Sequence, residues 1–477
     1  MSWINKESQN GNSDIEKDYP FARWMSWLFL LVSLLMLIYT FFQAEIINNG
    51  QLFGYYFDYY LISIVGFLFW AVVLRLGKEI RTNIVTIVTT MIVGLYLFEG
   101  VLIWLEHTKP SFKENIVIAK QLGVEYDERT KLELIEDLIA EGVDALPTVQ
   151  AQLPEHNEKG IDSLLTLGGV SNRTTVYGNE SGKYLIYESD RYGFNNPDSQ
   201  WDSQTIEWML IGDSFVHGAS VQPGEEISGQ IRFITGDDAI SLGISGNEPL
   251  LEYASIIEYA EAVKPKKVLW FYYEGNDIQS LVANQNDSFI MQYMEDGFSQ
   301  NLINRQKEID DLLEKYIVKE KEKEKEKMKD NAEESIMKVV LNKTKWIRLI
   351  HLRDLMGFFE RNTMHSNEFI FSQILAKAKE RVGAWNGKLY FVYLPEYTRY
   401  SNKFIFHNQF RSKSSVIDIV KELNIPVIDI HQAVFAFHPD PLALFPFRQP
   451  GHYNADGYRG VAKAVVTSVN KYEQSNK

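Results

Sequence analysis

The first hundred residues of the chain alternate between long uncharged apolar runs and short polar connections. The runs cover residues 24–44, 59–74 and 82–105, and the third contains one charged residue, Glu99. A bilayer core about 30 Å thick needs about 20 apolar residues per helix, with a lower limit near 17. The first run meets this length, and the other two meet it if flanking tyrosine and tryptophan side chains sit at the interfaces. We predict a transmembrane anchor of three helices within residues 24–106.

Basic residues flank these runs unevenly. They are Lys6, Lys17 and Arg23 before the first run, and Arg75, Lys78 and Arg81 between the second and third. Residues 45–58 contain none. Because basic flanks stay cytoplasmic, we expect a cytoplasmic tail over residues 1–23 and an extracytoplasmic region after Leu105, on the periplasmic or cell-surface side of a bacterial membrane. The polar start carries no small-residue cleavage site, which argues against a removable signal peptide.

Glu99 lies near the outer end of the third run. A carboxylate inside a membrane helix is a candidate functional group, and the alternative is a side chain that reaches the nearby interface. The sequence assigns Glu99 no role beyond these two interpretations.

Beyond the anchor the pattern changes to short apolar strands between amphipathic helices. Residues 107–205 form a lead-in, with a helical stretch over 111–141 and a β-hairpin over 174–189. In residues 206–477 the expected strands are 208–211, 239–242, 268–273, 389–394 and 427–430. Strands that alternate with helices are typical of an α/β fold, in which a parallel sheet has helices on both faces.

The connection between the third and fourth of these strands is longer than an ordinary crossover. We expect a charged helical insertion at about residues 300–345, in which Lys and Glu alternate over 319–327. A solvated helix or mobile arm explains this composition, and an arm that binds a partner is the alternative.

Composition excludes several kinds of chemistry. The chain has no cysteine, which excludes disulfides, thiolate catalysis and zinc–thiolate sites. Its net charge of −15 makes nucleic acid an unfavourable partner, because phosphate binding needs a basic surface. We expect no cofactor and no metal.

Four short blocks carry the candidate chemistry. They are Gly212-Asp213-Ser214-Phe215, Gly243-Ile244-Ser245-Gly246-Asn247, Gly275-Asn276-Asp277 and Gly451-His452-Tyr453-Asn454. The first three directly follow expected strands, and the fourth precedes the last expected helix, which starts near Ala455. Ligands bind at the carboxyl edge of an open parallel sheet, so we expect the blocks to converge there.

In this order the blocks resemble the SGNH (GDSL) hydrolases, in particular membrane-attached bacterial ones, from Trp208 to the C-terminus. The resemblance implies a flavodoxin-like three-layer α/β/α domain and a serine hydrolase that acts on ester bonds. It implies that Ser214 is the nucleophile and His452 the general base. The backbone N–H groups of Ser214 and Gly246 and the Asn276 amide would donate to the oxyanion. We expect His217 to be a local structural residue or part of a pocket wall, and not the base.

The chain departs from the family at the acid that orients the histidine. Most members place an aspartate two or three positions before it, where this chain has Pro450 and Gln449. A Ser–His dyad could operate with Gln449 or a backbone carbonyl as the orienting group. An acid elsewhere could replace the aspartate, and the candidates are Asp429, Asp440 and Asp456. The third alternative is a fold without catalysis.

Topology and resemblance together predict a membrane-anchored extracytoplasmic serine esterase or O-acyltransferase. Its expected substrates are acyl esters, above all acetyl esters of a surface polysaccharide, and it is expected to contact the lipid bilayer. A partner bound through residues 319–329 is the alternative to a solvated arm. The alternatives are a lipid esterase or thioesterase, and a catalytically silent binding or scaffold module of a polysaccharide assembly system. Hydrolysis and transfer need the same residues, so the sequence does not separate them.

Overall fold

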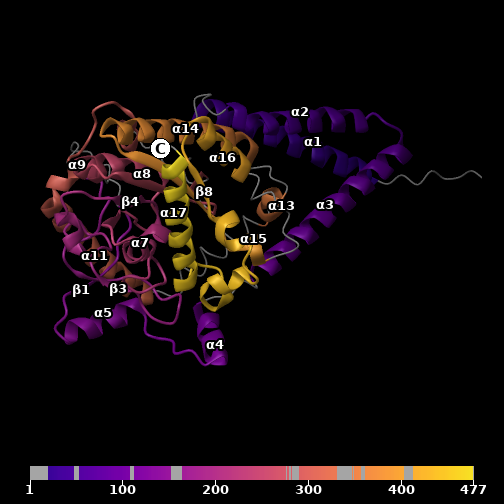
Figure 1. Ribbon diagram of the computed structural model, residues 1–477. Coiled ribbons are helices and arrows are strands. Elements are labelled where there is room, and N and C mark those ends of the chain that lie inside the picture. Colours follow the sequence, from indigo (N-terminus) through magenta and orange to yellow (C-terminus); the bar gives the residue numbers. More distant parts are fainter. Residues whose placement is uncertain are drawn as a thin grey trace, which may run out of the picture. The chain divides into compact units, whose positions relative to one another are not determined.

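The computed structural model describes residues 20–47, 53–107, 112–151, 164–275, 277–278, 281, 289–329, 346, 349–355, 360–401 and 412–475. The chain divides into two compact units. One comprises Met1–His107 with Asn342–Asp354, and the other comprises Thr108–Leu341 with Leu355–Lys477. Figure 1 labels the elements of both.

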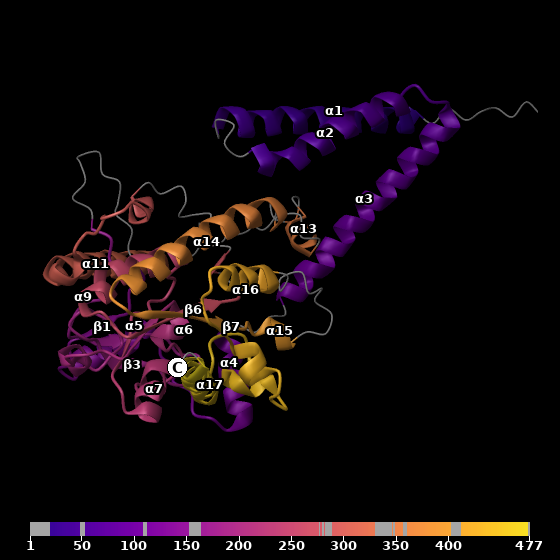
Figure 2. The ribbon, with the colours of Figure 1, turned by 45° about the horizontal axis from the view of Figure 1, so that its top comes forward.

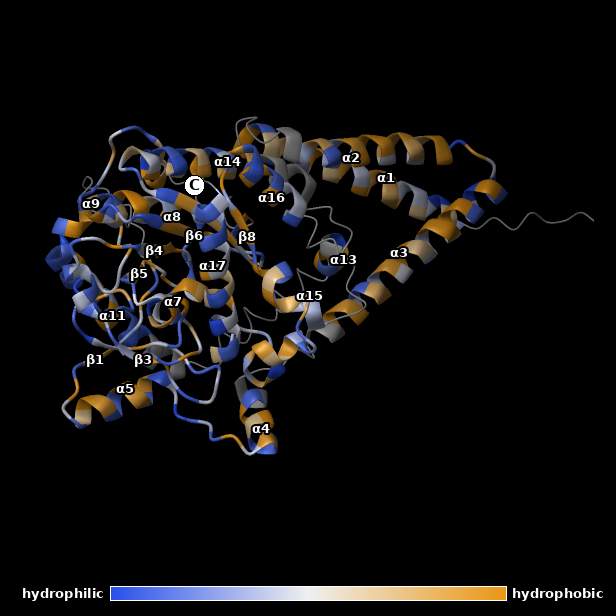
Figure 3. Cartoon of the chain, in the orientation of Figure 1, coloured by the Kyte–Doolittle hydropathy of each residue, from blue (hydrophilic) through white to orange (hydrophobic). Residues whose placement is uncertain are grey.

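Three apolar helices make up most of the first unit. They are α1 (Pro20–Phe41), continued by η1 (Phe42–Ile47), α2 (Phe53–Val73) and α3 (Lys78–His107). By length and composition each is able to cross a membrane, over Pro20–Ile47, Tyr56–Val73 and Lys78–Ile103. Phe29 stacks on Trp70 where α1 meets α2, with ring centroids 4.7 Å apart. Many large apolar side chains of the three helices are exposed, the surface expected for lipid contact. The hydropathy colours of Figure 3 mark long hydrophobic stretches on these helices.

The fully buried side chain of Glu99 is hydrogen-bonded within this unit. Its carboxylate accepts the backbone N–H groups of His351, at 3.0 Å, and Leu352, at 2.7 Å, and lies 2.8 Å from Nδ1 of His351. These residues belong to helix α13 (Ile350–Leu355). Glu99 therefore caps a helix that follows the insertion, and the expectation that its side chain reaches the membrane interface stays a prediction.

The second unit contains a five-stranded parallel sheet. Its strands are β4 (Trp208–Ile211), β5 (Ala239–Ser241), β6 (Lys267–Tyr273), β7 (Lys388–Leu394) and β8 (Val427–Asp429), in the order β5-β4-β6-β7-β8. Each lies within one residue of its predicted bounds. Numbered along the chain this order is 2-1-3-4-5, which is the flavodoxin-like arrangement. The predicted α/β fold is confirmed.

Helices cover both faces of the sheet. In Figure 2, β6 and β7 run between α14 (Glu360–Ala384) and α16 (Ser412–Glu422) on one side and α7 (Ile227–Thr235) and α17 (Ala455–Ser475) on the other. Along β4, Met209 and Ile211 face the first layer while Trp208 and Leu210 face the second. All four are buried, as a central strand covered on both faces requires. Shorter helices among the described residues of this region are α6 (Ser214–His217), α8 (Pro249–Ser255), η3 (Ile256–Ala260), α9 (Glu261–Val263), η4 (Ile290–Met294), η5 (Leu302–Asn304), α15 (Thr398–Ser401), η7 (His431–Phe435), η8 (Pro441–Leu444) and η9 (Pro446–Arg448).

The lead-in is structured and forms part of the same unit. It contains α4 (Phe112–Leu122), α5 (Lys131–Ala140), β1 (Ala145–Pro147), β2 (Thr174–Val176), β3 (Ile186–Glu188) and η2 (Asp198–Asp202). Strands β2 and β3 are antiparallel, which confirms the predicted hairpin, and β1 adds a third, parallel strand.

The insertion begins with α11 (Gln306–Lys329), which is not wholly a solvated arm. Ile309, Leu313 and Ile317 in its first half are buried in the main core. Solvent exposure at its apolar positions begins with Val318, just before the charged run.

Candidate active site

Ser214 stands where β4 runs into the first turn of α6. Asp213 precedes it, and the Asp213 carboxylate caps α6 by accepting the backbone N–H of Phe215 at 2.9 Å. Gly212 makes the tight turn possible, because a Cβ there would lie 2.5 Å from Cγ2 of Val216. Ser214 is 9% exposed, so its hydroxyl lies close to the protein surface but is almost covered.

His452 reaches the same point from the loop before α17. Its Nε2 lies 2.7 Å from Oγ of Ser214, which is the distance that a general base needs to take the serine proton. The imidazole rests against the ring of Phe215, with centroids 4.7 Å apart. The structure thus brings together two sequence-predicted residues that are 238 positions apart.

A third side chain completes this arrangement, and sequence reasoning missed it. Glu180 lies on the turn between β2 and β3, and its Oε1 is 2.8 Å from Nδ1 of His452. Its Oε2 accepts the backbone N–H of His452 at 2.9 Å and the Ser220 hydroxyl at 2.6 Å. Gly451 permits this approach, because a Cβ there would lie 2.6 Å from Oε2 of Glu180.

The hairpin turn that carries Glu180 is itself held in place. The Asn179 side chain accepts the N–H of Gly182 at 2.8 Å and donates to the carbonyl of Asp127 at 2.9 Å. Gly182 has a φ of +97°, which a glycine adopts without strain. The sequence Asn179-Glu180-Ser181-Gly182 signals the turn, but no local signal in it identifies Glu180 as a partner of His452.

The charges of Glu180 and His452 favour each other. Burial would raise the pKa of the Glu180 carboxyl, but the charge and hydrogen bonds of His452, with the Ser220 hydroxyl, lower that pKa to about 2. Burial would lower the pKa of His452, but the charge and hydrogen bond of Glu180, and more weakly Asp213, raise it above 6.5. Glu180 is therefore ionised when His452 binds a proton, as an acid that stabilises an imidazolium must be.

The acids that the sequence suggested as partners of His452 have other partners. Asp429 pairs with Lys413 at 2.7 Å, Asp456 pairs with Arg459 at 2.9 Å, and Asp440 pairs with Arg448. The Gln449 amide donates to the carbonyl of Phe447 at 3.5 Å. The suggestion that one of these four residues orients His452 is wrong, because Glu180 occupies the Nδ1 side of the ring.

The two glycines of the second block have different structural roles. Gly243 packs against α6, where a Cβ would lie 2.3 Å from the backbone nitrogen of His217. Gly246 has a φ of +78° in a turn closed by a hydrogen bond from Asn247 to Ile244. The oxyanion role of Gly246 stays a prediction. Asn276, the other predicted donor, lies outside the described residues.

The surroundings of His217 indicate a structural role. It is fully buried, its Nδ1 lies 3.2 Å from the carbonyl of Gly243, and Tyr177 and Tyr187 pack on its ring. Burial lowers its pKa to about 4, so the ring is neutral at physiological pH.

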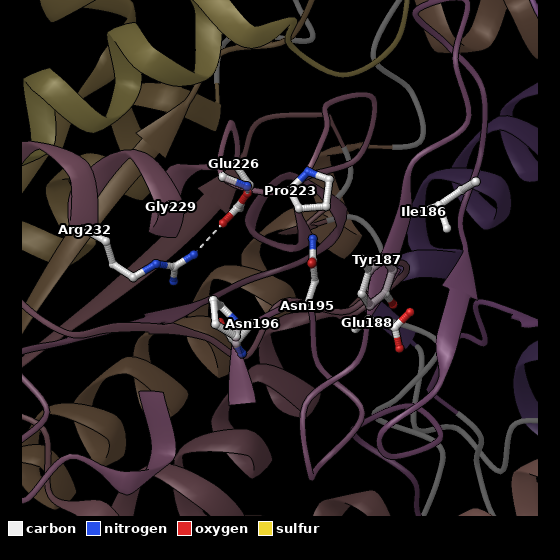
Figure 4. A pocket seen from close by; sticks show the side chains of 11 residues that line it. Ile186, Tyr187, Glu188, Asn195, Asn196, Pro223, Glu226, Gly229 and Arg232 are labelled. Atoms are coloured by element: carbon white, nitrogen blue, oxygen red, sulfur yellow. Dashed lines mark hydrogen bonds and ion pairs between the residues drawn. The ribbon is translucent and has the colours of Figure 1, made fainter. Parts of the chain in front are cut away.

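A separate pocket of about 590 Å³ lies beside the hairpin (Figure 4). Its lining includes β3 residues, Asn195 and the ion pair between Arg232 and Glu226, which is 2.8 Å long. Neither Ser214, Glu180 nor His452 lines it. The Asn195 amide donates to the carbonyl of His217, so this polar group already serves the packing of α6.

No family model and no curated protein matches this chain. Solved structures that are similar to it include a lipolytic protein of the G-D-S-L family from Desulfitobacterium hafniense DCB-2, at 11% identity and a TM-score of 0.32, covering 55% of this chain and 99% of that one. A lipase/acylhydrolase from Enterococcus faecalis has 12% identity and a TM-score of 0.32, with 56% and 97% covered. The acetyl xylan esterase AlAXEase has 12% identity and a TM-score of 0.31, with 55% and 100% covered. Because these values are low, the chemistry proposed for this chain rests on the geometry of its own side chains.

Proposed function

We propose that Ser214, His452 and Glu180 form the nucleophile, general base and orienting acid of an esterase. The observation that carries the proposal is the continuous line of contacts from Oγ of Ser214 to Nε2 of His452, at 2.7 Å, and from Nδ1 to Glu180, at 2.8 Å. An unactivated serine hydroxyl is a weak nucleophile, and a base in hydrogen-bond contact with it is the usual remedy.

The reaction would proceed in two stages. His452 takes the Ser214 proton while Oγ attacks the ester carbonyl, and the resulting imidazolium returns that proton to the leaving alcohol. Water, or an acceptor hydroxyl in a transfer reaction, then attacks the acyl-enzyme with His452 again as base. Glu180 holds the proton on Nδ1 throughout, so that Nε2 is free to accept. We assign oxyanion donation to the N–H groups of Ser214 and Gly246 and to the Asn276 amide.

We further propose that the substrate is an acyl ester of a surface polysaccharide. The basic flanks of the transmembrane helices support an extracytoplasmic position for the domain, where such a glycan is the accessible acyl carrier. Hydrolysis and transfer to a second glycan hydroxyl differ only in whether water or the acceptor reaches the acyl-enzyme.

The test uses the full-length protein in detergent micelles. We expect a fluorophosphonate probe to label the wild type and not Ser214→Ala, and we expect p-nitrophenyl acetate to be hydrolysed with the same dependence on Ser214. Release of acetate from an acetylated polysaccharide, compared with release of fatty acid from a long-chain ester, then separates the glycan substrate from a lipid one. A folded wild type that neither reacts with the probe nor hydrolyses the acetate ester would contradict catalysis and favour a silent binding module.

A further inference from the structure

The hairpin that provides Glu180 brings a second side chain to the site. Tyr177 directly follows β2, and its hydroxyl donates to Oγ of Ser245 at 3.1 Å. The Ser214 side chain is near enough to this hydroxyl to lower its pKa. Tyr177 therefore contacts both the turn of the second block, through Ser245, and the helix that begins at the nucleophile, through His217.

The Tyr177 ring is fixed in this position from two directions. It packs on the ring of His217, with centroids 4.9 Å apart and an interplanar angle of 31°. Its backbone N–H donates to the carbonyl of Leu185 at 2.9 Å, which continues the pairing of the hairpin. A ring held on both its face and its backbone loses little additional freedom when its hydroxyl binds a ligand, which is what a preorganised donor requires.

The electrostatic surroundings keep this hydroxyl protonated. Burial raises the pKa of Tyr177, and the negative charges of Glu180 and Asp213 add to this rise. The group is a neutral O–H donor across the physiological range. A carbonyl carbon bonded to Oγ of Ser214 would carry its developing negative oxygen beside that atom, and the Tyr177 hydroxyl is a donor in this neighbourhood.

We propose that the Tyr177 hydroxyl donates a hydrogen bond to the oxyanion, and that Ser245 orients it. This inference rests on the proposed esterase function. On attack by Ser214, the Tyr177 O–H turns from Ser245 toward the oxyanion, and the Ser245 hydroxyl donates to the phenol oxygen in return. No proton is transferred between Tyr177, Ser245 and the oxyanion in this reorientation. The donor is additional to those that the four sequence blocks provide, and it comes from the lead-in instead of the sheet.

The test compares Tyr177→Phe with Tyr184→Phe in the full-length protein. Tyr184 lies on the same hairpin, and its hydroxyl donates to the backbone carbonyl of Arg129 at 2.7 Å, so its removal probes loss of a phenol alone. For p-nitrophenyl acetate we expect Tyr177→Phe to lower kcat about 10²-fold, at the lower end of the range for one oxyanion donor, with KM little changed. Ser245→Ala should cost less, because it removes only the orienting group.

A boronic acid that adds to Ser214 provides the second measurement. Its tetrahedral adduct carries an oxygen where the oxyanion forms, so Tyr177→Phe should weaken binding of methylboronic acid by about the factor lost in kcat/KM. A rise in KM alone, or a kcat equal to that of Tyr184→Phe, would overturn the proposal. If Tyr177→Phe does not fold, 3-fluorotyrosine at position 177 keeps the ring and hydroxyl while making the donor more acidic. A kcat that changes with this acidity supports the proposal, and an unchanged kcat overturns it.

The two proposals fail in different ways. If the wild type is active and labelled and the kcat of Tyr177→Phe equals that of the wild type, only the proposed role of Tyr177 is contradicted. Wild-type protein that is folded but neither labelled nor active removes the esterase function and this inference together.

Discussion

Replacing Glu180 by glutamine tests how the three side chains of the site depend on one another. All groups around the carboxylate are donors: the His452 ring and backbone N–H groups and the Ser220 hydroxyl. An amide has one acceptor oxygen and one donor nitrogen. Its nitrogen must therefore face a group that is a donor in the wild type. The backbone N–H is unable to reverse its role, whereas the imidazole does so by changing tautomer. The amide nitrogen should therefore turn toward Nδ1.

In that arrangement Nδ1 becomes the acceptor and Nε2 carries the proton. An Nε2–H group cannot take the proton of Ser214, and the wrong tautomer costs about 10⁴ in kcat in a serine protease with this geometry. We expect Glu180→Gln to lower kcat for p-nitrophenyl acetate by about 10³- to 10⁴-fold, with folding intact. Glu188→Gln on the same hairpin serves as the control, because Glu188 is exposed and bonds the Thr174 side chain.

The pH dependence of kcat/KM gives a second measurement with an expected direction. Glu180 raises the pKa of His452 above 6.5, and the base acts only when neutral. The wild-type profile of kcat/KM should therefore rise with pH through a midpoint above 6.5. In Glu180→Gln this acidic limb should move to lower pH, because the negative charge that favoured the imidazolium is gone. Glu180→Gln with wild-type turnover and an unmoved limb would refute the assignment of Glu180 as the orienting acid.

Three further predictions concern Gly451, Glu252 and the topology of the transmembrane helices. Gly451→Ala should lower kcat at least 10-fold while Ser214 still binds a fluorophosphonate, because a Cβ there would displace the Glu180 carboxylate; a kcat within twofold of wild type would contradict this. Glu252→Gln should stabilise the protein increasingly from pH 5 to pH 8 in thermal melts. Burial, with the Asp213 charge, raises the folded-state pKa of Glu252 well above 4.5, so the folded state holds a proton that the unfolded state releases and wild-type stability falls as pH rises; a pH-independent difference in Tm would argue against it. A cysteine at Asn48 should react with an impermeant maleimide in intact cells and one at Gly77 should not, because the basic flanks place them on opposite sides; the reverse pattern would overturn the orientation.

The sheet could be predicted because each strand is a local pattern. The five strands are short apolar runs between helices, and burial on both faces leaves such runs little choice of conformation. Ser214 and His452 could also be predicted from the sequence, because residues that follow the strands of a parallel sheet lie together at its carboxyl edge. The local pattern predicts the sheet, and the sheet in turn predicts that these two residues, far apart in the sequence, lie close together.

Glu180 and Tyr177 could not be found in this way. They lie on a hairpin that is not part of the parallel sheet, so no rule of sheet topology brings them to its carboxyl edge. Their approach depends on packing between the lead-in and the region of the parallel sheet, for example on the hydrogen bond from the Ser220 hydroxyl to Glu180. The contact of Glu99 with α13 was hidden for the same reason, since it joins two segments 252 positions apart.

The missing aspartate and the hairpin acid are two aspects of one arrangement. Glu180 approaches His452 from the side of Gly451 and takes the backbone N–H of His452 as well as its ring. A second carboxylate at position 449 or 450 would bring another negative charge into this neighbourhood and raise the pKa of Glu180. Gln449 and Pro450 are uncharged, and together with the small Gly451 they leave one acid in contact with one imidazole. The uncharged loop before His452 is therefore compatible with an acid that the hairpin supplies.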